Sequence, residues 1–282
     1  MSTFFNKLTD RDMISQNMLR GDWMAQLDAD EKELAEILFH AYTNKKQLQK
    51  NRIPASIKKD VAYGIQHAVT ELKLEKSHES LIGYKVSLTS KDTQDLFDTD
   101  APLYGGLTES ALLDGQMALA DLAAPLLEVE LMFIAKEKLS IEDDIQDILR
   151  KMDVAPGIEV PDSRFEEWFP KISVGQVIAD SAVAGKVVLG EPQLSKSFEE
   201  LDNLEATLTL NGKLIAEGSS SSVLGHPVHS IQWLISALAE HGKSIEKGMV
   251  ISSGTFVQPR VLETGTYIAD FEGFGSVTLT VT

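Results

Sequence analysis

One mostly apolar segment, residues 125–135 (Pro-Leu-Leu-Glu-Val-Glu-Leu-Met-Phe-Ile-Ala), constrains the fold more than any other part of the chain. Its Val, Ile and Phe content and the proline at its start are typical of a buried β-strand. Because side chains alternate between the two faces of a strand, Glu128 and Glu130 share one face and the intervening apolar side chains share the other. Two adjacent carboxylates on such a strand repel each other unless a cation lies between them or one is protonated.

This pair of glutamates allows two interpretations. A hard divalent cation, Mg²⁺ or Mn²⁺, would neutralise oxygen ligands at this position. Alternatively, the segment is an edge strand whose acidic face lies in water. A Glu-x-Glu pattern alone is more often solvated, because carboxylates are seldom fully buried. The metal interpretation therefore requires a third carboxylate and a group that performs the chemistry.

Glu159 and Lys85 are the candidates for these two roles. Glu159 lies in residues 154–160, a short apolar segment, and three carboxylates on two strands could ligate one side of an octahedral ion. A salt bridge to Arg164 explains Glu159 at least as well. Lys85 lies inside the strand-like segment 81–86, where a lysine must be paired, extend to solvent or have a lowered pKa. A lysine with a pKa near neutrality can transfer protons, although an exposed strand lysine is the commoner case.

Composition limits the class of protein. The 282 residues are 43% hydrophobic and 24% charged, which is ordinary for a globular protein with a sizeable core. Cysteine is absent, which excludes disulfides and thiolate chemistry. With 43 acidic and 26 basic residues, the net charge of −17 argues against nucleic acid and anionic membranes as partners. No signal-like or membrane-spanning run occurs, so a cytoplasmic location is expected.

Two regions are expected in an α+β fold: a helical N-terminal subdomain over residues 1–79 and a strand-rich domain over residues 80–282. Helices are expected from about residue 8 to 75, with a break at the Asn-Arg-Ile-Pro sequence of residues 51–54. In the second region, Asn211-Gly212 is the strongest hairpin signal.

Several weaker patterns complete this description. We expect a strand over residues 116–122, a helix that begins at Ser140, and a polar region over residues 88–106 with one short helix after Ser90. Residues 226–242 predict a helix, because a proline occupies its first turn and a glycine follows its end.

Five motifs occur in order along the chain and support a family resemblance. They are Gly83-Tyr-Lys-Val-Ser-Leu-Thr-Ser90, Leu127-Glu-Val-Glu130, Gly157-Ile-Glu-Val-Pro-Asp-Ser-Arg164, Leu224-Gly-His-Pro227 and Gly273-Phe-Gly-Ser-Val277. With this order and spacing, the chain resembles the hydratase/decarboxylase branch of the fumarylacetoacetate hydrolase superfamily, which includes 2-keto-4-pentenoate hydratases and 4-oxalocrotonate decarboxylases. The resemblance covers nearly the whole chain and is closest from about residue 80 to 282.

The resemblance implies a mixed, rolled β-sheet with helices around it, and a homo-oligomer. It also implies that Glu128, Glu130 and Glu159 hold Mg²⁺ or Mn²⁺. That ion would chelate a small 2-oxo acid, and Lys85 would move a proton between the enol and keto forms.

The implied reaction is addition of water to a short 2-oxo-4-enoate or its 2-hydroxy-2,4-dienoate tautomer. Decarboxylation of the 4-oxalocrotonate type is the alternative, because both reactions pass through a dienolate that a metal and a lysine can stabilise. Two further alternatives are an acylpyruvate C–C hydrolase and a non-catalytic binding protein of the same fold.

The chain departs from the family pattern at the position that would activate water. Hydratases commonly have Pro-Asp-aromatic-Gly after the lysine strand, whereas residues 102–105 are Pro-Leu-Tyr-Gly, with Leu103 at the Asp position. Ser87 replaces a common glycine, and Asp180-Ser-Ala-Val183 replaces a common Asp-Asn-Ala-Ser. The change at Leu103 weakens the hydratase assignment but does not affect the metal site.

Overall fold

The computed structural model describes residues 22–282, which form two β-sheets and the helices around them. The larger sheet contains β1 (Leu81–Ser87), β2 (Leu103–Thr108), β4 (Leu126–Ala135), β5 (Met152–Val160), β6 (Lys186–Leu189), β9 (Val250–Thr255) and β10 (Arg260–Val261). The smaller sheet contains β3 (Gln116–Met117), β7 (Glu205–Leu210), β8 (Lys213–Ser219), β11 (Gly265–Phe271) and β12 (Gly275–Val281). The α-helices are α2 (Trp23–Gln26), α3 (Ala29–Asn44), α4 (Lys59–Lys76), α5 (Lys91–Leu96), α6 (Ile145–Arg150), α7 (Val174–Ala179), α8 (Phe198–Leu201) and α9 (Pro227–Glu240).

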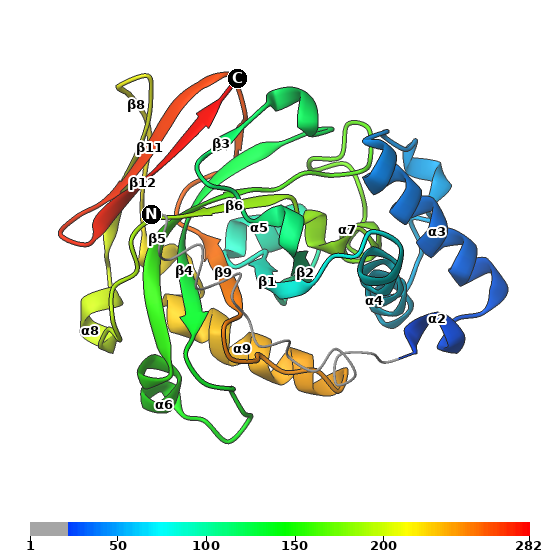
Figure 1. The fold of residues 1–282 in the computed structure, drawn as a ribbon, viewed down its shortest axis with the longest axis horizontal. Helices are drawn as coiled ribbons and strands as arrows, with labels where there is room; N and C mark the ends of the chain where they lie inside the picture. The colour runs from blue at the N-terminus through cyan, green and yellow to red at the C-terminus, as the bar shows by residue number, and fades with distance from the viewer. Residues whose placement is uncertain (1–21) are drawn as a thin grey trace.

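The larger sheet has the strand order β2-β1-β9-β4-β5-β6, with β10 paired to β4, and the smaller has the order β3-β12-β11-β7-β8. Figure 1 shows the smaller sheet on one side of the larger sheet and helices α2, α3 and α4 on the other. Parallel and antiparallel pairs occur in both sheets. These mixed sheets, with helices around them, confirm the α+β class.

Local sequence explains where several elements begin. Helix α3 begins after Asp28, whose side chain accepts a hydrogen bond from the Glu31 amide while the Glu31 side chain accepts one from the Asp28 amide. This reciprocal pair satisfies amides that a helix leaves free at its start. The β7–β8 hairpin turns at Asn211 and Gly212, which both have positive φ, as a two-residue hairpin of this type requires. Helix α9 begins at Pro227 as predicted, with His226 as its N-cap.

Two weaker expectations are wrong in detail. Residues 116–122 are a strand only over Gln116–Met117, and Leu119–Asp121 is a short 3-10 helix. The helix expected at Ser140 begins instead at Ile145, because Asp144 provides the capping carboxylate to the Asp147 amide.

The expectation of a polar region over residues 88–106 omitted strand β2, which begins at Leu103. Tyr104 and Leu107 of this strand are buried. The short helix expected after Ser90 is present as α5, with the Ser90 hydroxyl as its cap.

The N-terminal helices share an apolar core with later parts of the chain. One cluster of buried side chains contains Leu38 of α3, Ile65 of α4, Leu103 of β2 and Val177 of α7. The division at residues 79 and 80 stays a prediction, and the part of the helical expectation that falls on residues 8–21 lies outside the described residues.

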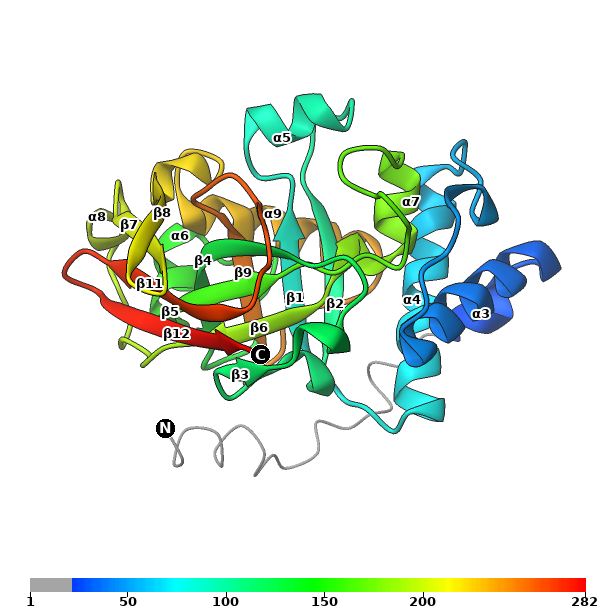
Figure 2. The ribbon, with the colours of Figure 1, turned by 90° about the horizontal axis from the view of Figure 1, so that it is seen from above.

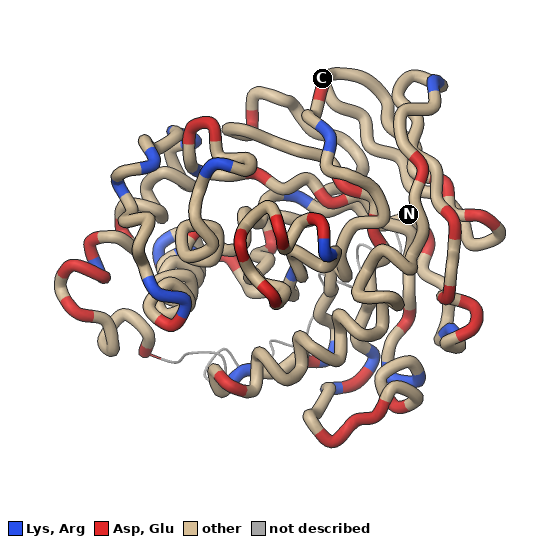
Figure 3. The backbone as a smooth tube through the Cα atoms, turned by 180° about the vertical axis from the view of Figure 1, so that it is seen from behind, with Lys and Arg blue, Asp and Glu red and all other residues tan. Residues whose placement is uncertain are grey.

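The acidic residues that dominate the net charge are spread over the described chain rather than gathered at one end (Figure 3). Within residues 22–282, every helix is too short or too polar to span a lipid bilayer.

Candidate active site

The three glutamates predicted as metal ligands come together on the adjacent antiparallel strands β4 and β5. The register places Glu128 directly opposite Glu159, and Glu130 lies two residues further along the same face of β4. One carboxylate oxygen from each residue lies within 4.8 Å of the other two. This arrangement could hold a divalent cation.

The alternative interpretation of an edge strand in water is wrong. Strand β4 pairs with β5 along one side and with β9 and β10 along the other, so it is an interior strand. Glu130 and Glu159 are 1% and 0% exposed, and Glu128 is partly buried. Because burial of unpaired carboxylates is unfavourable, this cluster requires positive charge or protons nearby.

Hydrogen bonds leave free oxygens in the cluster. One oxygen of Glu130, Oε2, accepts hydrogen bonds from the Ser252 hydroxyl at 2.5 Å and the Gly254 amide at 2.7 Å. Lys85 Nζ lies 2.8 Å from Glu159 Oε1, but this ion pair is not aligned as a hydrogen bond, and neither Glu159 oxygen accepts one within the described part of the chain. Glu159 therefore has lone pairs available for a metal ion.

The electrostatics of the cluster also fit a cation. Burial raises the pKa of Glu128 to about 7, an effect that Lys85 opposes and the Glu159 carboxylate reinforces. Burial and repulsion from Glu159 and Glu128 hold the pKa of Glu130 well above its ordinary value. A divalent ion among the three carboxylates would stabilise their ionised forms.

Lys85 is buried beside these carboxylates, 1% exposed, so the exposed-lysine interpretation is wrong. Burial by itself lowers its pKa, but the carboxylates of Glu159, Glu128 and Glu130 raise the pKa of Lys85 above its ordinary value. Of the three possibilities for a lysine inside a strand, the ion pair with Glu159 corresponds to pairing. Lys85 Nζ also donates a hydrogen bond to the Ala182 carbonyl at 3.2 Å.

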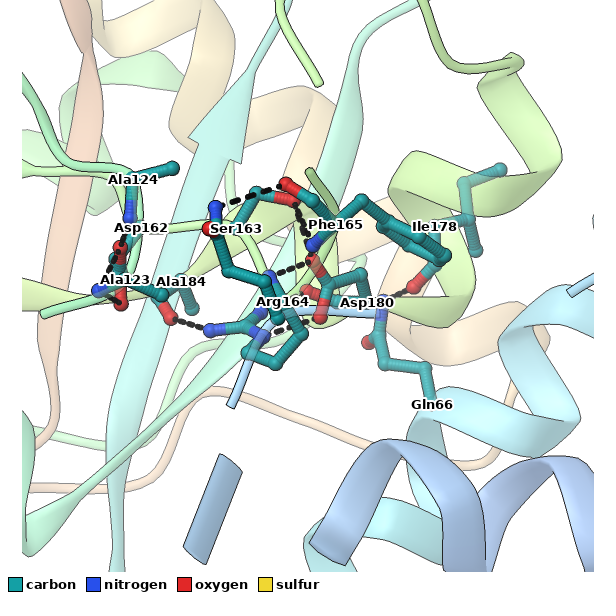
Figure 4. A network of polar contacts seen from close by, with 11 residues as sticks. Gln66, Ala123, Ala124, Asp162, Ser163, Arg164, Phe165, Ile178, Asp180 and Ala184 are labelled. Atoms are coloured by element: carbon teal, nitrogen blue, oxygen red, sulfur yellow. Dashed lines mark hydrogen bonds and ion pairs between the residues drawn. The ribbon is translucent and has the colours of Figure 1, made fainter. Parts of the chain in front are cut away.

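The salt bridge between Glu159 and Arg164, the alternative to metal ligation by Glu159, is absent from the described structure. Arg164 forms an ion pair with Asp180 instead, and both side chains are buried. The two residues are joined by several further hydrogen bonds (Figure 4).

A pocket opens beside the carboxylates and Lys85. Helix α5 lies above the end of β1 (Figure 2) and contributes Thr93 to the wall, with Phe97 just beyond it. The segment after β5 contributes Trp168 and Phe169. Among the described residues that line the pocket, Lys85, Glu128 and Glu130 carry the only ionisable side chains.

Sequence reasoning missed the aromatic wall, namely Phe97, Trp168 and Phe169. These residues occur in irregular or short segments without hydrophobic periodicity, so only tertiary structure reveals their position. The one available signal was the short distance in sequence between Glu159 and residues 168–169. Leu103, which occupies the position of a candidate water base, does not line the pocket; it is 2% exposed and belongs to the apolar cluster of Phe97 and Val177.

Comparison with known proteins supports the same family as the motifs. The family model for the fumarylacetoacetate hydrolase C-terminal domain matches residues 163–282. A 2-hydroxyhexa-2,4-dienoate hydratase of Comamonas testosteroni is 32% identical, over 69% of this chain and 75% of the relative. A 2-keto-4-pentenoate hydratase of Burkholderia vietnamiensis is 31% identical, over 79% of this chain and 86% of the relative. A 4-oxalocrotonate decarboxylase of Pseudomonas putida is 30% identical, over 77% of this chain and 83% of the relative.

Solved structures agree with the sequence relatives. A 4-oxalocrotonate decarboxylase from Pseudomonas putida G7, complexed with magnesium and adipate, has a TM-score of 0.80 at 26% identity, covering 97% of this chain and 100% of that chain. The same enzyme complexed with calcium and acetate has a TM-score of 0.78 at the same identity and coverage. The chain therefore belongs to the fumarylacetoacetate hydrolase superfamily, in its group of hydratases and decarboxylases.

Proposed function

We propose that the chain is a divalent-metal-dependent lyase that adds water to a short 2-oxo-4-enoate or its 2-hydroxy-2,4-dienoate tautomer. The observation that carries this proposal is the buried cluster of three carboxylates with Lys85. Two of these carboxylates, Glu128 and Glu130, line a pocket together with Lys85, and the other side chains of its lining are uncharged. The relatives named as hydratases support the same class of reaction.

Glu128, Glu130 and Glu159 would hold Mg²⁺ or Mn²⁺, which would polarise the 2-oxo and carboxylate oxygens of the substrate. Three observations support this assignment: the close approach of the three side chains, the free oxygens of Glu159 and the raised pKa values of the other two glutamates.

Lys85 would transfer protons during the reaction. A lysine is ordinarily protonated at neutral pH, so Lys85 would give a proton to the far carbon of the dienol while the 2-hydroxyl releases its own proton to solvent. The product is an α,β-unsaturated ketone. The neutral amine could then accept a proton from the water that adds to carbon 4, which restores the ammonium, and carbon 3 takes up a proton from solvent to complete the addition. Such a cycle needs no carboxylate at position 103.

The pocket wall indicates the kind of substrate tail. Phe97, Trp168 and Phe169 present aromatic surface, and Thr89 and Thr93 present hydroxyl groups. A second carboxylate at the far end of the substrate would be buried there without a cationic partner, which is costly. This wall therefore favours a monocarboxylate with a short, uncharged tail.

Decarboxylation remains the second candidate, and two observations favour it. A solved structure that covers almost the whole chain belongs to a 4-oxalocrotonate decarboxylase. In addition, Leu103 stands where an acidic water base is common in hydratases, and decarboxylation requires no such base.

Product analysis with two substrates separates these candidates. We would incubate the protein with 2-hydroxypenta-2,4-dienoate or with 2-hydroxymuconate, in Mg²⁺ or in EDTA, and determine product masses. The proposal expects Mg²⁺-dependent gain of one water by the monocarboxylate, with a kcat/KM at least about 100-fold above that for the dicarboxylate, because an unpaired buried charge is worth several kcal/mol. Loss of CO₂ from 2-hydroxymuconate without gain of water would instead identify a decarboxylase.

We also propose a cytoplasmic homo-oligomer with a helical subdomain at residues 1–79 and a catalytic domain at residues 80–282. The family resemblance implies the oligomer, and the acidic composition is compatible with the location. Neither nucleic acid nor membrane is proposed as a partner.

A further inference from the structure

We propose that Arg164 is a positioning residue for the reaction: together with Asp180, it holds residues 181–183 in a left-handed turn that orients Lys85 toward the carboxylate cluster. This inference rests on the proton-transfer role proposed for Lys85. It concerns a residue that lies outside the pocket lining and therefore acts through another group.

The turn has a backbone conformation that its residues disfavour. Ser181, Ala182 and Val183 have φ values of 55°, 48° and 54°, in the left-handed region. For residues other than glycine this conformation costs about 1–2 kcal/mol each, and it is least favourable for a β-branched residue such as Val183. Three successive residues of this kind require surrounding structure to hold them.

Arg164 supplies much of that support by bonding to both ends of the turn (Figure 4). Its Nη1 donates to the Ala184 carbonyl at 2.8 Å, and its Nη2 donates to the Asp180 carbonyl. Its Nε and its backbone amide donate to the two carboxylate oxygens of Asp180. One planar guanidinium thus fixes the distance between residues 180 and 184.

The remaining sides of the turn are also enclosed. The Asp162 amide donates to the Val183 carbonyl at 2.9 Å. On strand β2, a side chain at Gly105 would place its Cβ only 1.8 Å from the Ser181 carbonyl oxygen, so the strand backbone lies directly against the turn. The turn is therefore held between β2 and the segment that contains Arg164.

The turn contacts the proposed catalytic group directly. The Ala182 carbonyl accepts a hydrogen bond from Lys85 Nζ, and Glu159 Oε1 lies on another side of the same ammonium. The Ala182 carbonyl therefore fixes one N–H of Lys85, and Lys85 itself borders the pocket, which Val183 also lines. A shift of the Ala182 carbonyl would redirect that proton, and displacement of a catalytic group by about 1 Å can lower a rate about 100-fold.

The test compares wild type with Arg164→Lys, in which one ammonium cannot reach both carbonyls and the Asp180 carboxylate. We expect kcat for 2-hydroxypenta-2,4-dienoate to fall about 10- to 100-fold, while KM and the Kd for Mg²⁺ stay within about 3-fold. Amide hydrogen exchange over residues 180–184 should become faster. Arg150→Lys, at an exposed arginine with surface ion pairs, is the matched control and should change none of these quantities.

A second substitution distinguishes orientation of Lys85 from a general effect on folding. Glycine adopts the left-handed conformation without steric cost, so adding Ser181→Gly to Arg164→Lys should restore kcat at least about 3-fold. If Arg164→Lys does not fold, Asp180→Asn, which keeps the side-chain shape, replaces it in the test. This variant should likewise lower kcat while KM stays within about 3-fold.

Each remaining outcome would overturn the inference. An unchanged kcat in Arg164→Lys or in a folded Asp180→Asn, or a loss that comes wholly from weaker Mg²⁺ binding, would show that the turn does not position Lys85. If Ser181→Gly does not restore kcat in the Arg164→Lys background, the turn likewise does not position Lys85. If wild type itself shows no Mg²⁺-dependent turnover, the proposed function fails and this inference fails with it.

Discussion

Lys73 and Lys85 are both buried, but their surroundings differ in charge. Lys85 faces three carboxylates, which raise its pKa against the opposing effect of burial. Lys73, on α4, is 5% exposed and forms no ion pair with any residue in the described range. Its Nζ lies 3.5 Å from the centre of the Tyr42 ring, and burial lowers its pKa to about 7.

This contrast teaches that burial alone does not identify a functional lysine. The Lys73 ammonium lies over the face of an aromatic ring, an interaction worth about 0.5–2 kcal/mol, and Lys73 does not line the candidate active-site pocket. The Lys85 ammonium is compensated by groups that could also bind a metal, and it borders that pocket. The partners of each lysine therefore support the chemical role proposed for Lys85 and a structural role for Lys73.

The largest expected difference between the two lysines is in turnover. Lys85→Met should lower kcat at least about 1,000-fold, because the proposed proton donor is lost. Lys73→Met should leave kcat within about 2-fold. Both are measured from loss of the diene absorbance in saturating Mg²⁺, with circular dichroism as the control for folding. Similar kcat values for the two variants would remove the distinction between these lysines.

The next difference is in the pH dependence of stability. Between pH 7 and 10.5 the unfolded chain still binds the Lys73 proton that the folded chain has released, so this group makes the free energy of unfolding rise with pH, by at most about 1.4 kcal/mol per pH unit. Below pH 7 both states are protonated and the full penalty of burying the charge applies.

Lys73→Met should therefore be more stable than wild type at pH 6, and its stability should rise less between pH 7 and 9. Urea unfolding at several pH values measures both quantities. If the free energy of unfolding changes with pH in the same way in wild type and in Lys73→Met, the lowered pKa of Lys73 is contradicted.

The smallest expected effect concerns the ring beneath Lys73. Tyr42→Phe removes hydroxyl contacts with Ser110 and Glu79 but keeps the aromatic face, whereas Tyr42→Leu removes both. At pH 6, Tyr42→Leu should be less stable than Tyr42→Phe by about 0.5–2 kcal/mol beyond their difference at pH 9, where Lys73 is largely neutral. A difference that does not change with pH would show that only packing is involved.

The sequence was sufficient for elements that depend on local pattern. Strand β4 follows from its apolar run, α3 from its capping residues and α9 from its first-turn proline. Strand β2 was missed because its first residues belong to the segment 88–106, which was interpreted as one polar region. Close packing explains the glycine at position 105, since a Cβ there would collide with the Ser181 carbonyl.

The residue types of the candidate site could be predicted, but their surroundings could not. Glu128, Glu130, Glu159 and Lys85 are recognisable as unusual residues in apolar segments. Their convergence depends on the pairing register of β4 with β5, which no local pattern specifies. The partner of Arg164 was predicted wrongly for the same reason, because Asp180 is adjacent only in the folded chain.

Calorimetric titration with Mg²⁺ tests the central claim most directly, namely that the buried glutamates form a metal site. Wild type should bind one Mg²⁺ per chain, Glu128→Gln should raise the Kd at least about 100-fold through loss of an ionised ligand, and Glu79→Gln, in the region of Lys73, should bind as wild type does. Absence of Mg²⁺ binding by wild type at millimolar concentration, or equal Kd values for wild type and Glu128→Gln, would contradict the account.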